Sequence, residues 1–275
     1  MARLDACVLF AAIMLAAVAC SRTPPSVAAM TEPAVAPAPA ARDTGDPARG
    51  LHVATRLGCN GCHGDNAAGQ VFIDKPEVGR VVAPNLTQRR HAYDATTFAA
   101  LLREGRTPTG RPPLGMPIFM FQHLSDQEVR DVWAWLQALP DTPNAALPAT
   151  EYAAPIARAI ADGTLPYLDD VRADPGNAPP AVPPTERLAL GKHLAMTTCS
   201  ECHGRDLDGF PGDDAPGLVV AKAYDAARFA RLMKTGITAS GKPSKSGLMS
   251  EIAVGRLSSL TDAEVDALKA YLDAR

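Results

Sequence analysis

The sequence predicts an all-α protein made of two similar domains in tandem, joined by a Pro-rich linker. The first observation is a repeat of three blocks in the same order. CNGCHGDNAAG pairs with CSECHGRDLDG, DATTFAALLREG with DAARFARLMKTG, and LSDQEVRDVWAWL with LTDAEVDALKAYL. The second observation is that apolar residues recur at helical spacing in each copy. The third is that no convincing alternation of apolar and polar residues indicates a strand.

The 275 residues divide into five expected segments. These are an export signal at 1–19, an Ala/Pro-rich tether at 20–45, domain 1 at 46–143, a linker at 144–183 and domain 2 at 184–275. The formal net charge of −3 includes no basic excess, so no nucleic-acid partner is expected.

The N-terminal segment has the pattern of an export signal. Arg3 precedes an apolar run from Ala6 to Ala19, which is shorter than the roughly 20 residues of a spanning helix. The run ends in LAAVAC, which resembles a bacterial lipobox with Ala17 where Leu is usual. We therefore predict lipid attachment at Cys20, with plain cleavage and a soluble product as the alternative. In both cases the mature protein is expected in the periplasm of a Gram-negative bacterium, and the tether holds it away from the membrane.

Helix signals support the repeat. Short helices are expected to lead into Cys59 and Cys199. The closing helices begin with the capping boxes Ser125-x-x-Glu128 and Thr261-x-x-Glu264, in which side chains satisfy free backbone donors at the helix start. In the linker, EYAAPIARAIADG indicates a short helix and DPGNAPPAVPPT a stiff segment. We expect the linker to lie along the domain surfaces.

Each domain contains one CxxCH motif, the attachment site of a c-type haem. Two thiols three residues apart on a helical turn can reach both vinyl groups of a porphyrin, and the adjacent His then lies under the iron. The predicted thioethers come from Cys59 and Cys62 in domain 1 and from Cys199 and Cys202 in domain 2, with His63 and His203 as iron ligands. A shared zinc site is disfavoured because 137 positions separate Cys62 from Cys199. Neither zinc nor a disulfide explains the His after each pair.

A second axial ligand is expected from methionine, the usual partner in cytochromes c. Met116 lies in a Pro- and Gly-rich loop before the last helix of domain 1, and Met249 lies at the comparable place in domain 2. Met120 and His123 are open alternatives to Met116.

The order of CxxCH, Pro-containing loop, helix, Met-bearing loop and closing helix resembles a class I cytochrome c domain, present twice. The segment from Ala83 to Leu136 is particularly similar to the cytochrome subunits that serve bacterial periplasmic dehydrogenases. The resemblance implies that the carbonyls of Pro84 and Pro216 hold the ligand histidines. It also implies close helix crossings, at Gly50 with Trp135 and at Gly191 with Tyr271. Domain 2 departs from the pattern, because no Pro follows Met249 and its loop is longer.

These features predict an electron carrier rather than an enzyme. The expected donor is a dehydrogenase or a quinol-linked protein, and electrons are expected to pass to a terminal acceptor. The expected redox partner proteins are thus a dehydrogenase, an oxidase or a small carrier. The alternative is a two-haem periplasmic enzyme such as a peroxidase or a thiosulfate-oxidising enzyme. A sensor would need a five-coordinate haem. Basic residues near the Met loops either steer acidic partners or offset haem propionates; they are Arg106, Arg111, Lys242 and Lys245.

Trp133 is the last residue that the sequence singles out. It stands where domain 2 has Lys269, a position expected to be exposed. We therefore expect the two domains to dock, with Trp133 packed against the linker or domain 2.

Overall fold

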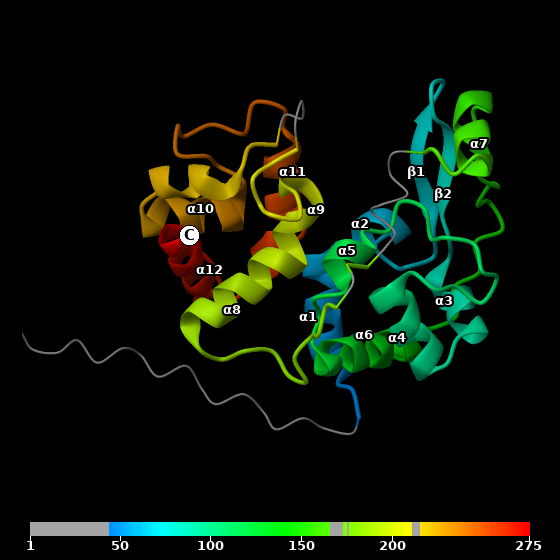
Figure 1. The fold of residues 1–275 in the computed structure, drawn as a ribbon, viewed down its shortest axis with the longest axis horizontal. Helices are drawn as coiled ribbons and strands as arrows, with labels where there is room; N and C mark the ends of the chain where they lie inside the picture. The colour runs from blue at the N-terminus through cyan, green and yellow to red at the C-terminus, as the bar shows by residue number, and fades with distance from the viewer. Residues whose placement is uncertain (1–43, 166–172, 175, 211–214) are drawn as a thin grey trace, which may run out of the picture. The chain divides into compact units, whose positions relative to one another are not determined.

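The computed structural model describes residues 44–165, 173–174, 176–210 and 215–275 (Figure 1). The predicted export signal, Cys20 and nearly all of the tether lie outside the described residues. No helix in the described ranges is long and apolar enough to cross a membrane.

Domain 1 is mostly helical. Its helices are α1 (Pro47–Leu57), α2 (Cys59–His63), α3 (Leu86–Arg89), α4 (Ala95–Glu104), α5 (Ile118–Phe121) and α6 (Asp126–Ala138), with a 3-10 turn η1 (Arg90–Ala92). Asp46 caps α1 by accepting hydrogen bonds from the backbone of Ala48 and Arg49. Helix α1 ends at Gly58, whose φ of 80° is the left-handed conformation that favours glycine.

Domain 2 repeats this plan. It contains α8 (Arg187–Leu194), a π-helical turn η3 (Ala195–Cys199), α9 (Ser200–His203), η4 (Leu218–Ala223), α10 (Ala226–Thr235), α11 (Leu248–Gly255), η5 (Leu257–Ser259) and α12 (Asp262–Ala274). The predicted capping boxes are present at the starts of both α6 and α12. The first and last helices of each domain pack together, α1 with α6 and α8 with α12 (Figure 1).

Glycine sets the distance of both helix crossings. A Cβ atom added to Gly50 would lie 1.9 Å from the carbonyl oxygen of Asp131, and one added to Gly191 would lie 2.0 Å from that of Ala267. The Cβ atoms of Trp135 and Tyr271 are each 2.7 Å from these positions. The crossings therefore have no room for a larger residue, as the resemblance implied.

Domain 1 also contains strands, which the sequence analysis did not predict. Strands β1 (Gln70–Lys75) and β2 (Gly79–Ala83) form an antiparallel hairpin. The linker adds β3 (Glu151–Tyr152) to the free edge of β2. The hairpin strands are rich in Val and Ile but only five or six residues long, so their alternation gives a weak signal.

The linker packs on domain 1 along much of its length. The short helix expected in it is α7 (Ala154–Ala161). Further on, the carbonyl oxygens of Pro180 and Ala181 accept hydrogen bonds from the backbone of Asp126 and Gln127, both at 3.0 Å. The linker therefore satisfies backbone donors at the start of α6.

The two domains dock through equivalent residues. His52 Nε2 lies 2.9 Å from Glu264 of domain 2, and His193 Nε2 lies 2.9 Å from Glu128 of domain 1. Both histidines stand two residues after the crossing glycine, and both glutamates belong to capping boxes. The contact is therefore reciprocal, like the interface of a two-fold dimer.

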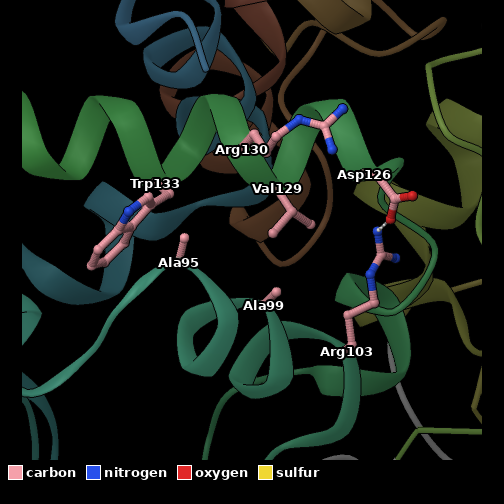
Figure 2. Close-up of a pocket in the computed structure, with 7 residues that line it drawn as sticks. All are labelled: Ala95, Ala99, Arg103, Asp126, Val129, Arg130 and Trp133. Carbon is pink, nitrogen blue, oxygen red and sulfur yellow. Dashed lines mark hydrogen bonds and ion pairs between the residues drawn. The ribbon is translucent and has the colours of Figure 1, made fainter. Parts of the chain in front are cut away.

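The prediction that Trp133 packs against the linker or domain 2 is wrong. Its ring packs on Phe98 of its own domain, with the ring centroids 5.0 Å apart. Figure 2 shows Trp133 on α6 beside Ala95, which begins α4. The equivalent Lys269 is not exposed either, because it is 8% accessible and pairs with Asp273. Trp133 lines a pocket between α4 and α6, and other residues hold the domains together.

Candidate haem sites

The CxxCH motif of domain 1 begins where α1 stops. After the left-handed Gly58, the chain forms the single turn α2, and Gly64 ends it with a φ of 83°. This turn points Cys59, Cys62 and His63 into one cavity of about 630 Å³. A volume between about 300 and 1,000 Å³ is typical of a site for a small organic ligand.

The histidine of each motif is held by a carbonyl oxygen. His63 Nδ1 lies 2.8 Å from Pro84 O, and His203 Nδ1 lies 2.7 Å from Pro216 O. Because a carbonyl only accepts, Nδ1 carries the proton and Nε2 keeps its lone pair for a metal. Burial lowers the pKa of both rings, despite the opposing effect of these hydrogen bonds. Both rings are therefore neutral, the form that binds iron.

The thiols are also held neutral. Burial raises the pKa of Cys59 to about 12 and that of Cys199 to about 12. Burial likewise raises the pKa of Cys62. Burial therefore disfavours a charged sulfur at these positions, and the thioether of an attached haem carries no charge.

The structure separates the candidates for the second axial ligand of domain 1. Met116 lines the cavity that contains His63. Met120 is completely buried in the domain core instead, and His123 hydrogen-bonds Asn177 of the linker. The geometry therefore favours Met116 over both alternatives, and ligation by Met116 stays a prediction.

In domain 2, Met249 lies in the first turn of α11, half buried against the core that Cys199 also contacts. Met233 is buried in that core at 3% exposure, so packing explains it. Ligation by Met249 likewise stays a prediction.

Arg90, which pairs with Asp141 at 2.7 Å but has one nitrogen without a partner among the described residues, tests whether a haem fits domain 1. Arg90 is buried in the cavity wall and donates to the carbonyl oxygens of Leu136 and Leu139, at 2.6 and 2.5 Å. Its Nε is buried and has no hydrogen-bond partner among the described residues. Arg111 of the predicted basic set also lines the cavity, while Arg106 pairs with Glu104 at 2.8 Å. A haem propionate would supply the acceptor that Arg90 lacks.

Comparisons with known families agree with this chemistry. Residues 45–136 match the family described as cytochrome c oxidase, cbb3-type, subunit III, and residues 188–274 match the cytochrome c family. The chain is a di-haem class I cytochrome c. A search among curated proteins finds no match to this cytochrome.

Each domain of the cytochrome binds one c-type haem covalently, and the protein transfers electrons through the two haem irons. The predictions of tandem cytochrome c domains and of two covalent haems are confirmed. The predicted all-α fold is confirmed as a mainly helical one, with the short strands β1, β2 and β3 as the departure.

Some residues around the first haem site come from outside domain 1, and the sequence analysis missed them. Thr150, Tyr152 and Ile160 of the linker line the cavity. Glu201 and Arg256 of domain 2 line it as well. Glu201 stands inside the second CxxCH motif, where the first has Gly61. This difference between the motifs was visible in the sequence, but nothing there indicated that Glu201 faces the other haem site.

Proposed function

We propose that this cytochrome carries single electrons through the periplasm, from a dehydrogenase or quinol-linked donor to a terminal acceptor. The observation that carries the proposal is that Met116 and His63 line one cavity. A haem ligated on both faces offers no open iron position to a substrate. When bound, each haem supplies reversible one-electron chemistry. The protein holds the histidine tautomer and limits access of water.

The family matched by domain 1 supports an oxidase as the terminal acceptor. That family is described as a subunit of a cbb3-type oxidase. The exchange of one electron between haems would be the same whether the protein is a mobile carrier or a domain of an oxidase. The exposed Lys242 and Lys245 in the loop before α11 support docking of an acidic redox partner at domain 2.

Absorption spectroscopy of the purified protein during a redox titration tests the proposal. We expect two haems, a thioether-to-iron band in the ferric protein and no binding of carbon monoxide to the ferrous protein. Replacing Met116 by His keeps two axial ligands but removes the sulfur that favours the ferrous state, so one potential should fall. Met249→His is the matched variant for the other haem. Binding of carbon monoxide by the wild type, together with turnover of peroxide, would favour the alternative of a two-haem enzyme.

We further propose that Cys20 anchors the mature protein to a membrane through a lipid. The support is the sequence LAAVAC and the Ala/Pro-rich tether after it. Cys20→Ser should move the cytochrome from the membrane pellet to the soluble periplasmic fraction. A wild-type protein that is already soluble after gentle lysis would contradict the anchor.

A further inference from the structure

Each domain sends an arginine to the haem-attachment segment of the other. Arg56 of α1 donates to the hydroxyls of Thr197 and Thr198, at 2.8 and 3.0 Å, directly before Cys199. Arg256, which follows α11 in domain 2, packs on Gly58, directly before Cys59. A Cβ atom added to Gly58 would lie 2.1 Å from Arg256 Cζ. The two attachment segments therefore face each other across the domain interface.

Arg256 is paired with a residue from inside the second CxxCH motif. Its Nη1 lies 2.5 Å from Oε2 of Glu201, with the side chains 13% and 25% exposed. Burial lowers the pKa of the Arg256 guanidinium, but the charge of Glu201 raises it above the ordinary value. The guanidinium therefore lies beside Gly58 and Gly61 of the first attachment segment and is paired with a residue of the second.

The same pair forms part of the first haem site. Both Glu201 and Arg256 line the cavity that contains His63 and Met116. Gly61 of the first motif leaves room for Arg256, because an added Cβ would still lie 3.7 Å from its Nε and Nη2. The pair is attached to the second haem site through the peptide bond between Glu201 and Cys202.

The docking contacts hold this pair in place. Glu128, which is 4% exposed, accepts from both Arg56 and His193 at the centre of the interface. His52 and Glu264 form the equivalent contact at its other side. Breaking a buried network of this kind is costly, so Glu201 and Arg256 are fixed relative to both attachment segments.

We propose that Glu201 and Arg256 form a charged bridge that belongs to both haem sites, so that loss of either charge shifts both haem potentials together. This inference rests on the proposed electron-transfer function and names the positioning residues for exchange between the haems. A ferric haem site carries one more positive charge than a ferrous one. A nearby carboxylate therefore favours the ferric state, and a nearby guanidinium favours the ferrous state. In the pair these effects offset each other at both sites.

The test is a redox titration of the intact holo-protein and of three variants. Glu201→Gln leaves the guanidinium uncompensated, so both potentials should rise. Arg256→Met leaves the carboxylate uncompensated, so both should fall. In the double variant both should return close to the wild-type values, because the two opposite charges are removed together and their shifts cancel. A purely structural role for the pair would instead give shifts of the same sign in the two single variants.

Arg187→Met is the matched control, because it removes one charge from an exposed pair with Asp266 in the same domain. It should leave both potentials nearly unchanged. Movement of only one titration step in Glu201→Gln and Arg256→Met would overturn the proposal, as would shifts no larger than the control. The titration uses no redox partner, so it is independent of which donor and acceptor serve the protein. Failure of the carrier proposal would appear separately, as binding of carbon monoxide by the wild type.

Discussion

Domains 1 and 2 share the residues that hold the haem in place, here called the frame. They differ in the residues that line the haem site, here called the wall. In both domains a Pro carbonyl fixes the histidine, a glycine permits the helix crossing and a capping box begins the last helix. Between the CxxCH motif and that Pro, domain 1 inserts the β1–β2 hairpin. Domain 2 has a shorter connection there, in which the described residues include an isolated bridge between Gly209 and Pro216.

The difference shows which parts of the fold are free to vary. Attachment needs a fixed turn and a fixed tautomer, and these are the same in both copies. The wall sets polarity and access to water, which tune the potential of a haem. Domain 1 has linker residues and Arg90 in its wall, whereas the position equivalent to Arg90 is the buried Ala221. We therefore expect two distinct potentials, and the following predictions test the comparison, beginning with the largest effect.

The first prediction compares the two capping-box glutamates. Glutamine preserves a capping box, so Glu128→Gln and Glu264→Gln change only the pairs between domains. Glu128→Gln leaves the buried Arg56 without its counter-charge and should lower the free energy of unfolding by about 3–5 kcal/mol. Glu264→Gln breaks a partly exposed pair and should cost about 1 kcal/mol or less. Urea unfolding of the holo-protein measures both, and equal costs would mean that the interface is not centred on Glu128.

The pH dependence of the free energy of unfolding should also differ between the wild type and Glu128→Gln. Burial disfavours the charge on Glu128, but Arg56 and His193 hold its pKa at about 2, against an ordinary value of 4.5. Because the pKa is lower in the folded protein, this stabilisation is complete above pH 4.5 and is lost as the pH falls towards 2. The wild type should lose stability faster than Glu128→Gln across this range. Parallel curves would contradict the assigned ion pair.

The sequence was sufficient to predict the frame because each part of it has a local signature. The CxxCH motifs, the capping boxes at Ser125 and Thr261 and the helices around them follow from spacing and hydrogen-bonding chemistry alone. The fixed histidines and the close helix crossings came from the family resemblance. Met116 could be preferred from its loop, and the cavity supports that preference.

The walls and the docking surface could not be predicted because they depend on contacts between distant segments. The hairpin strands are short, and β3 is supplied by the linker. Trp133 was assigned to the interface from its contrast with Lys269, but a comparison of repeats does not reveal which groove a side chain fills. The residues that do dock, His193 with Glu128 and His52 with Glu264, are polar and gave no hydrophobic signal.

The second prediction replaces one residue in the cavity wall of domain 1 by its counterpart in domain 2. Arg90→Ala copies Ala221 and removes an ion pair with Asp141 and hydrogen bonds from a charged donor to the carbonyls of Leu136 and Leu139. Hydrogen bonds of this kind are each worth about 1.5–3 kcal/mol, and water can replace part of them. We expect domain 1 to lose about 2 kcal/mol of stability. Loss of the cation should also lower one haem potential and leave the other unchanged. A drop in both potentials would mean that Arg90 acts through the interface.

The third prediction concerns Trp133 and has the smallest expected effect. Trp133→Lys copies domain 2 and removes an aromatic pair with Phe98, which is worth about 0.5–1.5 kcal/mol. The lysine stem can still cover part of the pocket. In domain 2 the equivalent lysine pairs with Asp273, one helical turn on, whereas domain 1 has Gln137 there. Adding Gln137→Asp should therefore recover roughly 0.3 kcal/mol.

Chemical unfolding of the wild type, the single variant and the double variant measures these differences. Because Trp133 packs within domain 1, neither variant should change the rate at which protease cleaves the linker, which reports on undocking of the domains. Faster cleavage with unaltered stability of domain 1 would show that Trp133 supports the domain interface after all. The same outcome would make the two copies less alike than their shared frame indicates, since only one would use this helix position for docking.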